Sequence, residues 1–366
     1  MATRLVSLDA LRGFTMFWIL GGGAFYRVFH ELPQNAFFSA LANQLTHVTW
    51  EGVHFYDLIF PTFIFVSGVS LVLSLPAKIA GRGHASVSWT VIRRAVTLYL
   101  IGLWCYGGIS HGIEGVRWVG VLQRIAFAYL GAALLFIWVK PKGLIAITIG
   151  ILLGYWALLE WVPVPGFGAG DLAEKHNLTN YLDQMYLPGK RWDGDHDPEG
   201  ILSNLPAIAT CLLGVFAGLW LVRAETALRK AWGLIGGGTL LVGLGWCWGQ
   251  YFPLIKKIWT SSYVLEAAGW SCLLLGLFYL VIDVAKIRRW ALPFVWIGLN
   301  PITLYIIESL AHSSAMADRF VGGDIYHGLS DHLFPGAGAL LLALVSSSIS
   351  IGLAWFLHHR RIYLRV

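Results

Sequence analysis

Long apolar runs alternate with short polar connections along the whole chain. A helix that crosses a bilayer needs about 20 consecutive, predominantly apolar residues, and runs of this length occur repeatedly. The pattern predicts an all-α, polytopic membrane protein with about ten transmembrane helices in a single domain, residues 1–366. The ten expected spans cover residues 11–29, 55–75, 91–109, 119–139, 143–162, 201–222, 231–252, 263–284, 290–311 and 335–357.

The composition supports a lipid-embedded protein and excludes an ordinary soluble domain. Hydrophobic residues make up 57% of the chain and charged residues only 13%, whereas soluble domains carry about 25% charged residues. The 18 tryptophans suit the aromatic belts found at membrane interfaces. The net charge of +6 comes from small basic clusters at span ends, which gives no reason to expect a nucleic-acid partner.

The placement of lysine and arginine predicts the orientation of the spans, because cytoplasmic connections are enriched in basic residues. If the N-terminus is cytoplasmic, seventeen basic residues fall in inner connections and eight in outer ones. Both termini are therefore expected in the cytoplasm. The one long connection, residues 163–200, then becomes an external loop, and His47 also lies on the outer face.

The segment LTHVTWEGVHFYDLIFPTFIFVSG, residues 45–68, places ionisable groups at the outer mouth of a span. His47 is a candidate acid–base or nucleophilic group, because an imidazole titrates near neutral pH. A plain interfacial histidine fits the same pattern. His47, Glu51 and His54 share one face of a helix, but no third strong ligand follows at a fixed offset, and zinc sites usually have three or four. We therefore expect no metal.

Two charged residues lie at similar membrane depth in different spans. They are Asp57 and Arg124, the latter in GVLQRIAFAYL. Charges at this depth are costly and usually face a partner or a cavity. We expect an Asp57–Arg124 ion pair, either as a structural clamp or as the border of a substrate cavity. Asp9 and Arg12, three residues apart at a cytoplasmic helix start, are expected to pair in the same way.

The external loop carries closely spaced carboxylates in RWDGDHDPEG, residues 191–200. The alternation of Asp193, Asp195 and Asp197 resembles a calcium-binding loop. The glycine, however, falls at the eighth position instead of the sixth, and the twelfth position is Asn204 instead of glutamate. The carboxylates, beside a tryptophan of the same stretch, can equally hydrogen-bond a sugar.

Six segments, in family order and spread over almost the whole chain, make the sequence resemble the heparan-α-glucosaminide N-acetyltransferase family of transmembrane acetyltransferases. It is most similar to the bacterial branch, parts of which are labelled as N-acetylglucosamine-related transporters. The opening LDALRG alone would be a weaker signal, because other integral-membrane acyltransferases begin similarly. The matching segments are RLVSLDALRG, HVTWEGVHFYDLIFPTFIFVSG, GVLQRIAFAYL, DPEGILSNLPAIATCLLGVFAG, KKIWTSSYVL and GLNPITLYI.

The resemblance implies a reaction that crosses the membrane. Acetyl-CoA, as co-substrate, would supply the acetyl group from the cytoplasm. The amine of a glucosamine-type sugar or glycan would accept it on the periplasmic side of a bacterial inner membrane. The family's active histidine corresponds to His47, which acts either as an acetyl carrier or as a base, and Asp57 is assigned to the catalytic group with it. Family analogy also suggests a homodimer.

Further residues of the matching segments are assigned to the two substrates. Those expected to bind the sugar are Trp50, Glu51, Gln123, Arg124, Asp197, Glu199 and Asn300. CoA carries phosphates, so a basic mouth is expected on the cytoplasmic side, although the positive-inside bias explains the same basic residues. The candidates for this mouth are Arg12, Arg93, Arg94, Arg288 and Arg289.

One departure from the family keeps other functions open. Related enzymes often carry an asparagine in the first span that can hydrogen-bond the acetyl carbonyl, whereas FWILGGG places Ile19 and Leu20 there. Asn300 or another group would have to replace this donor. Otherwise the protein handles a different acyl group or none. The alternatives are therefore a permease for N-acetylglucosamine-like sugars and an O-acetyltransferase of an envelope glycan.

Overall fold

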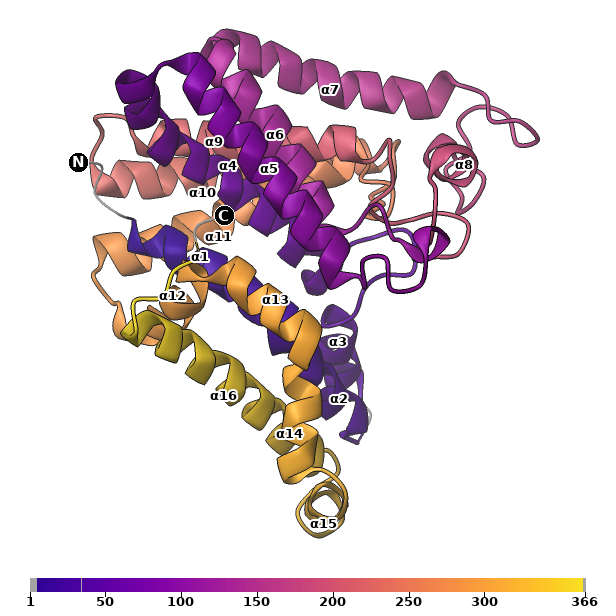
Figure 1. Ribbon diagram of the computed structural model, residues 1–366, viewed down its shortest axis with the longest axis vertical. Coiled ribbons are helices and arrows are strands. Elements are labelled where there is room, and N and C mark those ends of the chain that lie inside the picture. The colour runs from indigo at the N-terminus through magenta and orange to yellow at the C-terminus, as the bar shows by residue number, and fades with distance from the viewer. Residues whose placement is uncertain (1–4, 34, 365–366) are drawn as a thin grey trace.

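The computed structural model describes residues 5–33 and 35–364, and every regular element among them is a helix (Figure 1). The N-terminal part consists of α1 (Val6–Phe17), the π-helical turn η1 (Trp18–Gly22), α2 (Gly23–Glu31) and α3 (Ala36–Gln44). The next part consists of α4 (Phe55–Arg82), α5 (His84–Cys105), the short turn η2 (Ile113–Gly115), α6 (Val121–Trp138) and α7 (Pro141–Trp161).

The second half begins with the long loop, which contains α8 (Leu178–Tyr186). Three long helices follow: α9 (Asn204–Leu221), α10 (Ala227–Gly249) and α11 (Ser261–Phe278), which continues into the π-helical η3 (Tyr279–Val284). The C-terminal part consists of η4 (Arg289–Ala291), α12 (Leu292–Leu299), α13 (Pro301–Ala311), α14 (Ser313–Val321), α15 (Asp324–His332) and α16 (Ala337–His359). Figure 1 shows α7 along one edge of the molecule and α15 at the opposite tip.

Seven helices of the described chain are long and apolar enough to cross a membrane: α4, α6, α7, α9, α10, α11 with η3, and α16. The segment Arg289–Leu299 and α13 meet at a bend of 75° and form an eighth span if they count as one broken helix. The expected spans 11–29 and 91–109 are also helical, but the first is divided among α1, η1 and α2, and the second contains Arg93 and Arg94 within α5. The all-α membrane architecture is confirmed. The count of ten spans and the sides of the termini stay predictions.

The helices α4, α6 and α9 run in the same direction. Phe65 of α4 lies against Gly214 of α9, and Val72, further along α4, lies against Gly218. Near its start α6 also contacts the start of α9, because the Arg124 guanidinium donates a hydrogen bond to Ser203 Oγ. These three helices therefore begin at the same end of the bundle.

Helix α11 joins them in the same direction. At its start, the Tyr263 hydroxyl donates to the Asp57 carbonyl oxygen at 2.7 Å. Further along both helices, Thr62 Oγ1 of α4 lies 2.8 Å from Ser271 Oγ of α11. The amino-terminal ends of four helices, α4, α6, α9 and α11, thus gather in one region.

Glycines bring α4 and α9 into backbone contact. A Cβ atom on Gly68 would lie 2.0 Å from the Cys211 carbonyl oxygen, and one on Gly214 would lie 2.0 Å from the Phe65 carbonyl oxygen. Small residues allow such close approach, which drives helix association where lipid removes the hydrophobic driving force. In the apolar stretch of α4, 67% is buried within the molecule, against 22% in the apolar stretch of α10.

We predict that Gly214→Ala separates α4 from α9, because even one methyl group would overlap backbone atoms of the neighbouring helix. Overpacking of this kind typically costs about 1–3 kcal/mol. In the matched control, Gly150→Ala on α7, the new methyl group would meet no atom within 4 Å. Thermal unfolding of both purified variants in detergent measures the difference. Equal melting temperatures would show that the α4–α9 contact does not hold the bundle.

Candidate active site

A cavity of about 280 Å³ lies where α4, α6, α9 and α11 begin. A larger groove, of about 660 Å³, lies along α7 but is almost entirely apolar and offers no reactive group. The residues that line the smaller cavity are His47, Val48, Trp50, Asp57, Tyr106, Arg117, Val121, Arg124, Trp192, Asp193, Pro198, Glu199, Lys256, Lys257 and Trp259.

Asp57 connects the start of α4 to the reactive groups of the cavity. Its Oδ2 atom accepts hydrogen bonds from the backbone N–H groups of Val48 (3.2 Å) and His54 (3.1 Å), which caps the helix. Its Oδ1 atom lies 2.7 Å from His47 Nδ1 and 3.0 Å from Lys256 Nζ. The Asp57 carboxylate is buried, whereas the His47 side chain is 54% exposed, so a buried anion orients a reachable imidazole.

The protonation of His47 decides what the imidazole can do. A proton on Nδ1 can be donated to Asp57, which leaves the lone pair of Nε2 for a substrate, and this arrangement makes a base or a nucleophile. Lys256 Nζ lies 2.9 Å from the same Nδ1 atom and, when charged, can donate to it instead. Burial lowers the pKa of Lys256, and Asp57 opposes this shift. Lys256 is therefore placed to influence which tautomer His47 adopts.

The expected ion pair between Asp57 and Arg124 is wrong. Asp57 pairs with Lys256 from the loop before α11, and the Arg124 guanidinium lies over the Trp259 ring, 4.5 Å from its centroid. The two residues have similar depths in their spans, but depth alone does not fix the direction in which a side chain leaves a helix. The expected pair between Asp9 and Arg12 is confirmed, with Nη1 3.4 Å from Oδ1.

Arg117 anchors the loop residues that form another wall of the cavity. Its guanidinium donates to Asp197 Oδ2 (2.8 Å) and Oδ1 (2.7 Å), and to Glu199 Oε2 (2.7 Å). The rings of Tyr106 and Trp192 each lie within 5 Å of its Cζ atom. Burial opposes the charge on Arg117, but hydrogen bonds to Asp197 and the field of both carboxylates outweigh it and raise its pKa. Arg117 is thus a permanent cation held by two carboxylates.

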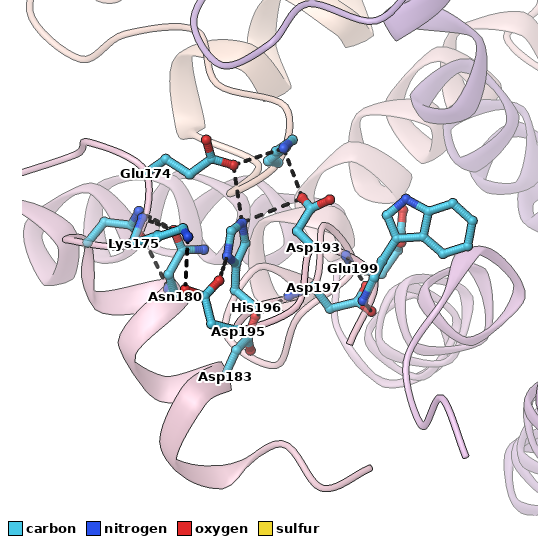
Figure 2. Close-up of polar contacts among 12 residues, drawn as sticks. Glu174, Lys175, Asn180, Asp183, Asp193, Asp195, His196, Asp197 and Glu199 are labelled. Carbon is cyan, nitrogen blue, oxygen red and sulfur yellow. Dashed lines mark hydrogen bonds and ion pairs between the residues drawn. The ribbon is translucent and has the colours of Figure 1, made fainter. Parts of the chain in front are cut away.

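Figure 2 shows a second ion-pair network in the long loop. Lys257 Nζ lies 2.9 Å from both Glu174 Oε1 and Asp193 Oδ2. His196 is buried, and its Nε2 atom lies 3.5 Å from each of the same two oxygens. The Glu174, Asp193 and His196 ligand atoms lie within 4.8 Å of one another, a spacing that can suit a metal ion, but the Lys257 ammonium already supplies the positive charge between the carboxylates.

The three aspartates that resemble a calcium loop are held by cationic groups and by opposite nitrogens of the His196 ring. Asp193 pairs with Lys257, Asp195 Oδ1 lies 2.7 Å from His196 Nδ1, and Asp197 pairs with Arg117. Their carboxylates therefore do not converge on one ligand position.

The structure brings together five of the residues assigned from sequence and leaves others outside the cavity lining. Those that line it are His47, Trp50, Asp57, Arg124 and Glu199, with Asp197 held against Arg117.

Three of the residues expected to bind the sugar lie elsewhere. Glu51 is exposed and pairs its backbone with Ile255. Gln123 and Asn300 are buried outside the lining, and among the described residues their side-chain amides have no hydrogen-bond partner.

The arginines expected to bind CoA come from separate places on the fold. Arg12 of α1 donates to Ser70 Oγ (2.6 Å) and to the Gly298 carbonyl (3.4 Å). Arg93 and Arg94 are exposed on α5, and Arg288 and Arg289 are exposed where α12 begins. None of the five lines the cavity described above, so their role stays a prediction.

Several lining residues were not assigned from sequence, most importantly Arg117, Lys256 and Lys257. The sequence did contain a feature that could have identified Lys256 and Lys257 as functional residues. KKIWT places adjacent lysines directly before a span, in a connection that the charge bias assigns to the outside, where basic residues are disfavoured.

We predict that Asp197→Asn destabilises the protein by about 3 kcal/mol, because it weakens a buried pair and leaves Arg117 incompletely compensated. The control is Glu225→Gln, which removes the more exposed Arg229–Glu225 pair (2.9 Å) and should cost less than about 1 kcal/mol. Thermal unfolding in detergent measures both changes. Similar losses in the two variants would contradict the anchoring role of Arg117.

Comparisons with known proteins identify the family of the chain. The family model described as heparan-alpha-glucosaminide N-acetyltransferase, catalytic, matches residues 4–244. The heparan-alpha-glucosaminide N-acetyltransferases of Mus musculus and Homo sapiens are 27% and 28% identical to the chain, over 83% of its length. The match covers 53% and 52% of those proteins, so the chain spans about half the length of the curated relatives it matches. The chain belongs to the family of the heparan-alpha-glucosaminide N-acetyltransferase catalytic domain.

Proposed function

We propose that the protein transfers an acetyl group from cytoplasmic acetyl-CoA to the amine of a glucosamine-type sugar on the periplasmic face of a bacterial inner membrane. The observation that carries the proposal is the 2.7 Å contact of His47 with Asp57 at a cavity that also holds carboxylates and tryptophans. Membership of the family supports the same reaction, and family analogy supports a homodimer.

The reaction needs a group that accepts the proton released by the attacking amine. The amine nitrogen attacks the thioester carbonyl carbon, the C–S bond breaks, and CoA leaves as a thiolate. The amine loses a proton during the attack, and Nε2 of His47 can accept it while Asp57 holds Nδ1. If His47 attacks the thioester first, the same nitrogen carries the acetyl group until the sugar amine takes it.

The exposed side of the cavity suits an amino sugar. Trp50 and Trp192 supply aromatic surface, which can pack against the apolar face of a sugar ring. Asp193 and Glu199 supply carboxylate oxygens that can accept hydrogen bonds from hydroxyl or amine groups. The cavity thus combines aromatic surface with polar groups that can fix the orientation of a small molecule.

A narrow apolar cleft of about 10 Å³ lies beside the cavity, and the acyl-bearing arm of CoA would enter there only if the cleft widens. Val121 lines both spaces, and the hydroxyls of Tyr106 and Tyr305, one from each lining, lie 3.5 Å apart. The cleft is otherwise lined by Met16, Ile19, Phe63, Leu122, Ile125, Pro301 and Ile302. The phosphates of CoA would be bound by the arginines assigned to the cytoplasmic mouth.

We predict that the purified protein makes N-acetylglucosamine from radiolabelled acetyl-CoA and glucosamine, and that His47→Ala slows this transfer by about 10²–10⁴-fold. A positioned general base contributes a factor of this size. CoA should stabilise the wild-type and His47→Ala proteins equally against thermal unfolding, because a ligand that binds the folded state raises the melting temperature. The control is His111→Ala, which changes an exposed histidine outside the cavity lining.

Three outcomes would contradict the proposed function. Normal turnover of His47→Ala would remove the imidazole from the reaction. Uptake of sugar into vesicles that lack acetyl-CoA, without transfer in its presence, would favour a permease. Labelled O-acetyl product with an amine-free glycan would favour the O-acetyltransferase.

We predict that the cavity faces the periplasm. In a Cys247→Ala background, which removes an exposed thiol, Tyr186→Cys in the long loop should react with a membrane-impermeant thiol reagent in intact cells. Ile287→Cys, in the basic connection before α12, should react only after the cells are opened. Both original side chains are exposed. The reverse labelling pattern would rule out delivery of the acetyl group across the membrane.

A further inference from the structure

Arg124 is a buried cation whose hydrogen-bonding capacity is largely unused. Only 1% of the residue is exposed. Its guanidinium donates one hydrogen bond, to Ser203 Oγ, while Nε and Nη1 have no partner among the described residues. Within the same residues no carboxylate forms an ion pair with it. Arg117, seven positions earlier in the loop before α6, by contrast forms ion pairs with two carboxylates.

The surroundings hold this guanidinium in one orientation. Its Cζ atom lies 4.5 Å from the centroid of the buried Trp259 ring, and Ser203 fixes one of its nitrogens. Arg124 also belongs to the first turn of α6, where the unsatisfied N–H groups of a helix create a partial positive charge. The charge of the guanidinium and the partial charge of the helix start both favour a negative group or an electron-rich oxygen beside Arg124.

A buried and unpaired guanidinium is costly to maintain. Each unsatisfied buried donor costs about 1–3 kcal/mol, and more when the group is charged. Such a group is useful where negative charge develops during a reaction, because fixed donors in a water-poor site need no reorganisation. Arg124 lines the same cavity as His47, so its guanidinium belongs to the wall of the candidate reaction site.

The position of Arg124 favours the acyl group over the sugar as its ligand. Trp192 and His47, which face the solvent side of the cavity, are exposed, whereas Arg124 is buried. Val121, one turn earlier on α6, borders both the cavity and the apolar cleft. Arg124 therefore lies one turn from the residue shared by the cavity and the cleft, on the buried side of the cavity, away from the solvent through which an amine would enter.

We propose that Arg124 binds the carbonyl oxygen of the acetyl thioester and stabilises the oxyanion that forms on it. This inference rests on the proposed acetyl transfer. As the amine nitrogen bonds to the carbonyl carbon, the C=O π electrons move to the oxygen, which accepts hydrogen bonds from Nε–H and Nη1–H. When the C=O bond forms again, the C–S bond breaks, the thiolate leaves, and the amine proton passes to His47.

The test is the carbonyl stretch of bound acetyl-CoA, observed by infrared difference spectroscopy between ¹²C- and ¹³C-carbonyl-labelled acetyl-CoA. The His47→Ala background without sugar prevents turnover. The thioester band should lie below its position in free acetyl-CoA, because donation to the oxygen weakens the C=O bond. Arg124→Gln should return the band toward the free position, and Ser203→Ala, which releases the guanidinium, should return it partly. Arg124→Lys provides a second variant that keeps the charge but loses the fork of donors.

Binding and kinetics separate this inference from the proposed function. Acetyl-CoA that fails to stabilise the wild-type protein against thermal unfolding would overturn the proposed function. Binding with a carbonyl band at the free position, or with a lowered band that neither Arg124 variant moves, would overturn only the role of Arg124. In proteins with intact His47, Arg124→Lys should lower kcat by on the order of 10²–10³-fold with little change in KM. An unchanged kcat would contradict the inference.

Discussion

The parallel packing of α4, α6, α9 and α11 is the constraint on which the rest of the structure depends. Glycines at the α4–α9 contact remove side-chain volume, so that backbone meets backbone. Hydrogen bonds from Tyr263 and Arg124 register α11 and α6 against these helices. Because all four helices begin at one end, the residues that precede them are collected into a single cavity. The reactive groups are therefore close in space although they come from four distant parts of the chain.

The same packing explains the unusual charge of this region. Four helix starts bring partial positive charge together, and Arg117, Lys256 and Lys257 add full positive charges. Asp57 balances Lys256 at the start of α4, and Asp197 and Glu199 balance Arg117. Burial raises the pKa of Glu199, against the fields of Arg124 and Arg117. Among the described arginines and lysines that line the cavity, Arg124 alone forms no ion pair, although the field of Glu199 acts on it.

The sequence was sufficient for the all-α membrane architecture, and it singled out His47 and Asp57, but it did not show that Asp57 and Lys256 both contact the His47 imidazole. Apolar runs reveal spans because the bilayer requires them, and the His47 segment stands out because it is polar beside such a run. The wrong pairing of Asp57 with Arg124 arose because a sequence shows how deep a residue lies in a span, but not the direction in which its side chain leaves the helix axis. Lys256 was counted only as an outer cation, since its contact with Asp57 joins residues that are 199 positions apart.

The long loop that forms one wall of the cavity is held by ion pairs, whereas the helix bundle beneath it is held by close packing. The Lys257 contacts with Glu174 and Asp193 are ionic, and all three side chains are partly exposed. Dissolved ions screen such contacts over about 8 Å at physiological ionic strength, whereas helix packing through small residues is insensitive to them. High ionic strength can therefore loosen the rim of the cavity while its floor stays packed, so the width of the opening would respond to salt and would limit a large ligand more than a small one.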